Sequence, residues 1–186
     1  MTSTVLNIHQ NIVDQCRKND PDGQRELYRL YSKAMFNICL RITNSYEDAE
    51  DVLQEAFVNA FKNFKSYKEE ATVGAWLKRI MVNTAVNHVK KKRLELVPLE
   101  NSNPVPVSEE TFEEKEITSF EISRIKEAVN ELPDGFRVVF SLYIMEGYDH
   151  KEIAEILNIT ESTSKSQLNR AKKKLRDTLN AQVNYG

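Results

Sequence analysis

Apolar residues recur every three or four positions along most of the chain, and this spacing predicts α-helices. The most regular run follows Ser45, which is placed to cap a helix. Its apolar positions are Ala49, Val52, Leu53, Ala56, Phe57, Ala60, Phe61 and Phe64. An earlier helix is predicted from Asp20 and Pro21, because an N-cap carboxylate followed by proline favours a helix start. Its apolar face consists of Leu27, Leu30, Tyr31, Ala34, Ile38 and Ile42.

A third helix is predicted over about 73–92, with Leu77, Ile80, Met81, Thr84 and Ala85 on its buried side. The periodicity stops after Arg93. Residues 95–118 carry three prolines and clustered acids, which predicts a flexible acidic linker without a core of its own. The linker separates a first helical domain, residues 1–94, from a second, residues 119–186.

The second domain has the pattern of a helix-turn-helix. A helix bearing Ile122, Ile125, Val129 and Leu132 ends at Pro133, and a short apolar helix follows over 136–145. Asp149 and Glu152 form a capping box for the next helix. Asn158 suits the left-handed turn before a last helix over about 161–181. The predicted fold is therefore all-α: two small helical domains joined by a flexible acidic linker, the C-terminal one a helix-turn-helix.

The last helix has an inward face and a polar face. Ser164, Leu168, Ala171 and Leu175 share the inward face, and the Ser164 hydroxyl is expected to bond to the carbonyl of Thr160. Short polar side chains can reach base edges in a major groove, and lysines and arginines can reach phosphates. The candidate DNA-reading residues are Ser162, Thr163, Lys165, Ser166, Asn169, Arg170 and Lys173.

The net charge of −2 hides a strong segregation of charge along the chain. Residues 47–55 hold five acids and no base, and 78–93 hold six bases and no acid. Residues 95–116 hold seven acids and one base, and the last helix is basic again. A partner that contacts one segment meets a potential very different from the chain average.

Two polar stripes in the first domain are candidate interaction surfaces. Asp48, Asp51, Gln54, Glu55 and Asn59 lie on one side of the helix after Ser45. Repulsion among its carboxylates would be relieved by a basic partner, although a solvated face is the ordinary explanation. The third helix aligns Trp76, Arg79, Asn83, Asn87 and Lys90, followed by Lys91 and Arg93. An aromatic ring with amides and cations suits single-stranded nucleic acid, although Trp76 could equally be a core-edge residue.

No residue pattern indicates catalysis, a cofactor or a metal site. The three histidines are scattered, and Cys16 and Cys39 have no CxxC partner. No apolar run approaches the roughly 18 residues of a membrane span, and the first residues lack the pattern of a signal peptide. We therefore expect a cytoplasmic protein that is not an enzyme and does not insert into membranes.

Three segments together resemble the extracytoplasmic-function (ECF) group of sigma factors of RNA polymerase, in the sigma-70 family. "DAEDVLQEAFVNAFKN" (48–63) is similar to the family's polymerase-binding helix, and "VGAWLKRIMVNTAVNHVKKKR" (73–93) is similar to its minus-10 segment. The stretch from 132 to 175 resembles its minus-35-binding domain. Within the last helix, "TSKSQL" with "RAKKKL" is similar to members from Bacteroidetes.

The resemblance implies a sigma factor that directs promoter-specific initiation without enzymatic activity. The first domain would bind the β′ coiled coil of core polymerase through the stripe that includes Asp51, Gln54 and Glu55, and would read the minus-10 element. The last helix would read the minus-35 element as duplex DNA. The resemblance also implies contact with the β flap, passage of the linker toward the RNA exit path, and control by an anti-sigma factor.

Two other hypotheses are compatible with parts of the sequence. An ordinary helix-turn-helix repressor or activator would explain residues 132–181, but it would leave the acidic helix and the Trp76 stripe unexplained. A module that binds only proteins, such as an anti-sigma antagonist, would not account for the six bases between Lys78 and Arg93.

Overall fold

The computed structural model describes residues 9–96 and 119–183, and within these ranges it contains helices and turns but no strand. The chain divides into two compact units, Met1–Val97 and Pro98–Gly186. The predicted all-α fold with two helical domains is confirmed. The predicted acidic linker lies outside the described residues, except for 95 and 96, which belong to the last helix of the first unit.

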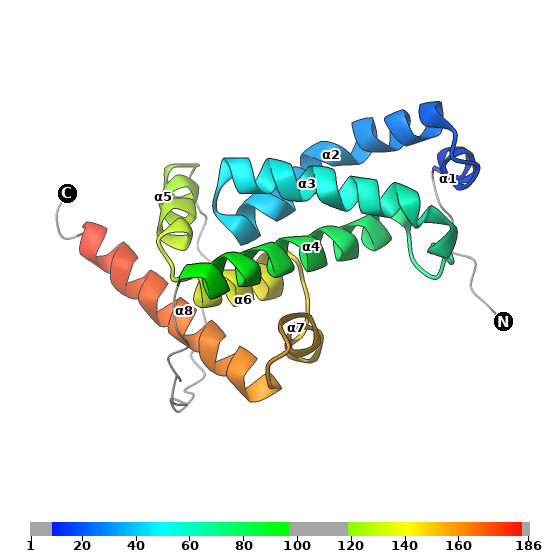
Figure 1. Ribbon diagram of the computed structural model, residues 1–186. Helices are drawn as coiled ribbons and strands as arrows, with labels where there is room; N and C mark the ends of the chain where they lie inside the picture. Colours follow the sequence, from blue (N-terminus) through cyan, green and yellow to red (C-terminus); the bar gives the residue numbers. More distant parts are fainter. Residues whose placement is uncertain (1–8, 97–118, 184–186) are drawn as a thin grey trace. The chain divides into compact units, whose positions relative to one another are not determined.

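The first unit is built around three long helices that pack against one another (Figure 1). Its elements are α1 (Gln10–Arg17), α2 (Pro21–Thr43), α3 (Tyr46–Lys62), the 3-10 turn η1 (Phe64–Ser66) and α4 (Val73–Leu96). The short helix α1 packs on α2 and touches η1. The helix α4 continues three residues past Arg93, where the apolar periodicity ends.

Local capping signals set the helix boundaries of this unit as predicted. The Asp20 carboxylate accepts a hydrogen bond from the backbone N–H of Asp22 at 2.9 Å, and Pro21 occupies the first helical position. Asn44 ends α2 in the left-handed conformation with φ of 56°. The Ser45 hydroxyl then accepts from the backbone N–H of Asp48 at 3.2 Å, so that only two residues, Asn44 and Ser45, separate α2 from α3.

The core of the first unit follows the predicted stripe on α3, apart from the half-buried Phe61. On α4, Leu77, Met81 and Ala85 are buried as predicted, whereas Ile80 and Thr84 are half-buried and the unpredicted Val82 and Val86 are buried.

The prediction also fails in part on α2. The buried residues of α2 are Gly23, Leu27, Met35, Ile38, Cys39 and Ile42. Leu30 and Ala34 were expected on the apolar face, but both are exposed. Each precedes a core-facing position by one residue, a rotation of about 100° around the helix, which turns it toward solvent.

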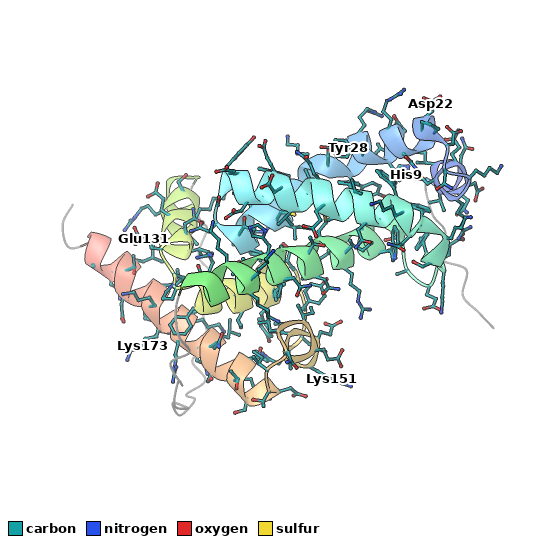
Figure 2. All side chains as sticks on the ribbon, viewed as in Figure 1. His9, Asp22, Tyr28, Glu131, Lys151 and Lys173 are labelled. Carbon is teal, nitrogen blue, oxygen red and sulfur yellow. The ribbon has the colours of Figure 1, made fainter. Side chains whose placement is uncertain are left out.

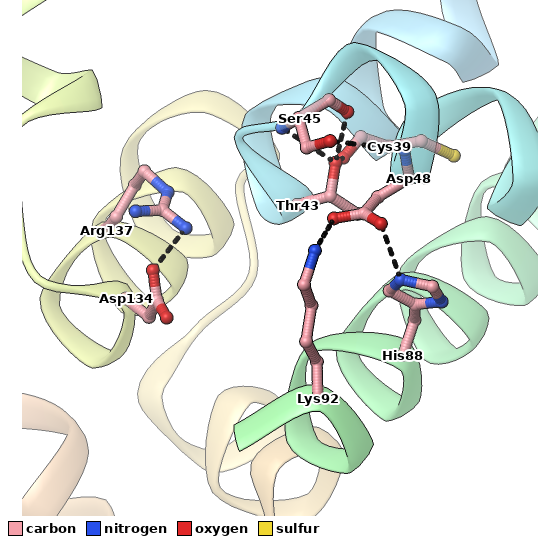
Figure 3. A network of polar contacts seen from close by, with 8 residues as sticks. All are labelled: Cys39, Thr43, Ser45, Asp48, His88, Lys92, Asp134 and Arg137. Atoms are coloured by element: carbon pink, nitrogen blue, oxygen red, sulfur yellow. Dashed lines mark hydrogen bonds and ion pairs between the residues drawn. The ribbon is translucent and has the colours of Figure 1, made fainter. Parts of the chain in front are cut away.

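Asp48 joins the N-terminal end of α3 to the C-terminal part of α4 (Figure 3). One carboxylate oxygen lies 2.7 Å from Lys92 Nζ, and the other lies 3.2 Å from His88 Nε2. The hydrogen bond from Lys92 is the largest influence lowering the pKa of Asp48, and His88 acts in the same direction. The side chain of Asp48 is only 16% exposed, but that of Lys92 is 54% exposed, so water still screens this ion pair in part.

The second unit consists of shorter helices around one long helix. Its elements are α5 (Ser119–Asn130), α6 (Asp134–Phe140), the π-helical turn η2 (Ser141–Met145), α7 (His150–Leu157) and α8 (Glu161–Val183). The helix α8 packs against α5, α6 and α7. The buried guanidinium of Arg137 donates to the Leu132 carbonyl at 3.1 Å and to Asp134 at 2.7 Å (Figure 3).

The helix predicted over 136–145 is present in part: it begins at Asp134, and its last five residues, Ser141–Met145, form a π-helical turn instead of continuing the α-helix. The backbone N–H of Glu146 reaches back five residues to the Ser141 carbonyl, at 3.0 Å. Three large apolar side chains of this turn, Tyr143, Ile144 and Met145, are exposed. The turn closes at Gly147, whose φ of +76° is a conformation that favours glycine.

The helix-turn-helix itself is confirmed in its local details. Asp149 and Glu152 exchange the two hydrogen bonds of a capping box, at 2.8 and 2.9 Å. Asn158 occupies the left-handed region with φ of 55°. The Thr160 hydroxyl then accepts from the backbone N–H of Thr163 at 3.0 Å and so caps α8.

The inward face of α8 is also confirmed, since Ser164, Leu168, Ala171 and Leu175 are all buried. The partner predicted for Ser164 is wrong. Its hydroxyl lies 2.9 Å from His150 Nδ1, and the Thr160 carbonyl accepts the backbone N–H of Ser164 instead. Burial lowers the pKa of His150, and the charge of Lys165 adds to this shift. The polar pair therefore lies inside the packing of α7 on α8.

We predict that Asp48→Asn lowers the free energy of unfolding at pH 7 by about 1–3 kcal/mol, because it removes a charged hydrogen-bond partner of Lys92. Since folding lowers the pKa of Asp48 from its ordinary 3.8, its stabilisation is present above that pH and is lost as the pH falls. Urea denaturation should therefore show a stability difference between the two proteins that is full at neutral pH and shrinks only as the pH falls below 3.8.

The matched control is Glu26→Gln, which removes an exposed carboxylate paired with Arg29 on α2. We expect little change in its urea midpoint. An Asp48→Asn protein as stable as the parent at pH 7 would contradict the structural role of this contact.

Candidate nucleic-acid and protein interfaces

The acidic face of α3 is exposed over most of the predicted stripe. Asp51, Gln54, Glu55 and Asn59 are all exposed, within three turns of one helix. Val58, which was not among the predicted residues, lies among them and is 50% exposed. Val58 does not fit the helical spacing of the buried apolar residues of α3. This mismatch was the sequence feature that could have identified it as an exposed apolar residue. The surface is thus a polar stripe with one apolar side chain inside it.

Asp48 was predicted to belong to this acidic face, but the structure directs its side chain elsewhere. Its carboxylate is half-buried and binds Lys92 and His88 of α4. The four other residues of the stripe are exposed. Asp48 therefore fixes α3 against α4, whereas the exposed stripe is available to a partner.

The predicted stripe on α4 divides into an exposed and a half-buried part. Arg79, Asn83 and Asn87 are exposed at intervals of four residues, and Lys91 continues the same row. Lys90 is half-buried, and this burial lowers its pKa. Arg93 belongs to α4, and its side chain lies outside the described part of the structure.

Trp76 lies at the edge of an aromatic cluster. Its ring is 5.2 Å from Phe64 in an edge-to-face contact and 5.2 Å from Tyr67 in a tilted contact. Phe64 and Tyr67 are buried, whereas Trp76 is half-buried. The ring therefore packs on the edge of the core and keeps part of its surface exposed.

The candidate residues of α8 all lie away from its buried face, but they differ in exposure. Ser162, Lys165 and Lys173 are exposed, and Figure 2 labels Lys173 on this helix. The half-buried members are Thr163, Ser166, Asn169 and Arg170.

Two hydroxyls on this face already make hydrogen bonds within the helix. The Thr163 and Thr160 hydroxyls lie 2.8 Å apart, and Ser166 Oγ donates to the Thr163 carbonyl at 2.9 Å. Since a hydroxyl oxygen has two lone pairs, Ser166 can still accept a hydrogen bond from a base.

Among the described residues, no group of three or more His, Cys, Asp or Glu side chains is placed to hold a metal ion. No helix in the described ranges is both long and apolar enough to span a membrane. Both cysteines are buried, and burial raises the pKa of Cys16 to about 11 and of Cys39 to about 12. Their thiols are consequently protonated at neutral pH.

Comparison with protein-family models finds two matches, one in each unit. The model described as Sigma-70 region 2 matches residues 27–95, and the model described as Sigma-70, region 4 matches residues 122–175. The first match begins inside α2, after α1, and covers the rest of α2, all of α3 and nearly all of α4. The second covers nearly all of the helix-turn-helix unit up to the middle of α8.

Curated relatives match over most of their own length. The chain is 30% identical over 165 residues to the ECF RNA polymerase sigma factor SigM of Bacillus subtilis, covering 86% of this chain and 96% of SigM. It is 29% identical over 176 residues to SigW of the same organism, covering 90% and 94%.

A solved structure shares the fold. The sigma factor RpoE of Bartonella quintana, in complex with the anti-sigma factor NepR, matches with a TM-score of 0.55 at 21% identity, covering 84% of this chain and 96% of RpoE. The two family regions and the curated relatives agree: this chain belongs to the sigma-70 family, in its ECF group of RNA polymerase sigma factors.

Proposed function

We propose that this sigma factor divides promoter-specific initiation among three helices: α3 binds core polymerase, α4 captures the minus-10 element and α8 reads the minus-35 element. The observation that carries the proposal is the separation of an exposed acidic stripe on α3 from exposed polar and basic stripes on α4 and α8. A DNA-binding protein that acted without polymerase would have no use for an acidic docking face.

The polymerase-binding surface consists of Asp51, Gln54, Glu55 and Asn59, with Val58 as an apolar contact inside it. Exposed carboxylates on one helix favour a basic partner, and the family resemblance supports the β′ coiled coil as that partner. Buried apolar contact at the centre of a polar rim is typical of protein interfaces. Asp48 contributes indirectly, because its bonds to α4 hold the start of α3 in place.

The minus-10 surface consists of the exposed row on α4 and its half-buried neighbours. Asn83 and Asn87 offer amide donors and acceptors to unpaired bases, while Arg79 and Lys91 are suited to phosphates. The exposed part of Trp76 can stack on one base. Lys90 and Arg93 complete the basic end of this surface in the proposal.

The minus-35 surface is the outer face of α8. Ser162, Lys165 and Lys173 are the most accessible, and Thr163, Ser166, Asn169 and Arg170 flank them. Few of these can reach phosphates at once, so binding of the free chain to duplex DNA should be modest and sensitive to salt. From the sequence pattern of this helix alone, we also propose that the chain is similar to family members from Bacteroidetes.

The remaining assignments rest on family resemblance. We propose that residues 1–94 and 119–186 are the two functional domains. Residues 95–118 would join them and run toward the RNA exit path of the polymerase. The β flap would bind the second domain, and an anti-sigma factor would control the protein in the cytoplasm. Support for that control comes from the structurally similar sigma factor RpoE, which was solved in complex with the anti-sigma factor NepR. The chain itself would have no enzymatic activity.

The decisive test is run-off transcription from genomic fragments of the source organism, with core polymerase alone and with added chain. We expect discrete transcripts only when both are present. If the chain alone bound one duplex tightly and polymerase added nothing to its selectivity, the chain would be an ordinary helix-turn-helix regulator.

The polymerase-binding surface is tested by Asp51→Arg combined with Glu55→Arg. Reversing both charges makes this surface more positive by four charge units, so that it repels a basic partner. We expect core binding to weaken by at least tenfold, a cost of about 1.4 kcal/mol. Competition with labelled parent protein for core polymerase measures this affinity.

The matched control is Asp22→Arg with Glu127→Arg, which changes net charge equally at exposed acids outside α3. Core affinity should remain at the parental value in the control, and circular dichroism should show unchanged helicity in both proteins. Equal loss of affinity in both would indicate a general charge effect and reject the docking face.

The recognition helix is tested by Lys165→Ala, since Lys165 is exposed on the outer face of α8. We expect promoter binding by the holoenzyme to weaken by about 1–3 kcal/mol if the side chain contacts a base, and by less for a single phosphate. Lys126→Ala on α5 provides a control that removes an exposed lysine elsewhere in the same unit. Indistinguishable promoter affinities for Lys165→Ala, Lys126→Ala and the parent would show that this face of α8 does not read DNA.

A further inference from the structure

The helix α1 precedes the region that matches the family model and makes specific contacts with the segment that leads into α4. It packs closely on α2 because Gly23 is buried there without a side chain. A Cβ at that position would lie 2.4 Å from Gln15 Cβ and 3.2 Å from the Cys16 backbone nitrogen. The missing side chain at Gly23 therefore lets α1 approach the backbone of α2 closely.

Arg17, at the end of α1, holds this segment through three kinds of contact. Its Nη1 lies 2.5 Å from Glu69 Oε1, and its Nη2 donates to the Tyr67 carbonyl at 3.1 Å. The guanidinium carbon also lies 5.9 Å from the centre of the Tyr67 ring. Because side chains of Arg17 and Glu69 are only 35% and 24% exposed, this cluster is partly shielded from water.

The backbone at Glu69 gives a reason for such a tether. Glu69 has φ of 59°, in the left-handed region that side-chain-bearing residues rarely adopt. A residue in this conformation costs of order 1 kcal/mol and persists when its surroundings hold it. Gln10 Nε2 lies 3.4 Å from the same Glu69 oxygen, so both ends of α1 reach this residue.

The tethered segment connects directly to Trp76. The buried Tyr67 ring packs on Trp76, and its hydroxyl donates to the Ala71 carbonyl at 2.7 Å. One residue further on, the Thr72 carbonyl accepts the backbone N–H of Trp76 at 3.0 Å. A displacement of Tyr67 or of the segment to Thr72 would therefore move the first turn of α4.

We propose that Arg17 and Glu69 are positioning residues for minus-10 recognition, through which α1 holds Tyr67–Thr72 and thereby sets the orientation of Trp76 at the start of α4. The inference rests on the proposed role of the α4 stripe. An ordered support lowers the entropy lost when an unpaired strand binds, and small displacements of a binding group can reduce binding strongly. Neither residue needs to contact DNA.

The test measures the affinity of reconstituted holoenzyme for a fluorescent single strand, the non-template minus-10 strand of a promoter identified by run-off transcription. We expect Arg17→Ala to weaken this binding by roughly tenfold, and Arg17→Lys by less, because lysine keeps the charge and loses the second hydrogen bond. Affinity for core polymerase and for minus-35 duplex should stay at the parental level. The matched control is Arg25→Ala, which breaks an exposed pair with Asp22 on α2 and should leave all three affinities unchanged.

Asn83→Ala with Asn87→Ala separates failure of the inference from failure of the proposed function. If this double variant keeps parental affinity for the single strand, the α4 stripe does not bind it and the proposed function is wrong. If the double variant loses affinity while Arg17→Ala and Arg17→Lys do not, the positioning role alone is overturned. Should Arg17→Ala fail to fold by circular dichroism, parental single-strand affinity in Arg17→Lys and Glu69→Gln would overturn it equally.

Discussion

The first unit depends on packing an acidic helix against a basic one without cancelling the charge of either. The helices α3 and α4 pack against each other, and their apolar residues Val52, Ala56, Leu77 and Met81 are fully buried. Their opposite charges meet at Asp48, which binds Lys92 and His88 where the start of α3 lies beside the end of α4. The Asp48 carboxylate thus pairs with two side chains of α4 at once, while Asp51 and Glu55 remain exposed. Apolar packing therefore holds the two helices together, while the exposed charges remain available to partners of opposite charge.

The sequence predicts well those features that depend on neighbouring residues. Helix starts at Asp20, Ser45 and Asp149, and the left-handed turn at Asn158, follow from capping chemistry within three residues of the chain. The buried face of α8 follows from helical periodicity alone. These signals were enough to predict an all-α fold and the order of its helices, and the three motifs were enough to identify the family.

Features that depend on distant pairing were not predictable in the same way. Ser164 was assigned a local carbonyl partner, but its hydroxyl meets His150, fourteen residues away on another helix. Asp48 was placed in the acidic stripe, whereas its carboxylate binds Lys92, which is 44 residues away. The π-helical turn at Ser141–Met145 has no simple periodic signature, and Leu30 was misassigned by one step around its helix. In each case tertiary packing selected among partners or rotations that a local pattern allows equally.

The burial of both thiols has a consequence for how the protein responds to its chemical surroundings. Oxidants and alkylating reagents attack the thiolate, and Cys16 and Cys39 combine raised pKa values with side chains that solvent does not reach. Their reaction with peroxide or maleimide should therefore be slow while the first unit is folded. Thiol reactivity would then report unfolding of α1 and α2, where the two cysteines lie, and a cysteine introduced on an exposed face could be labelled selectively against this unreactive background.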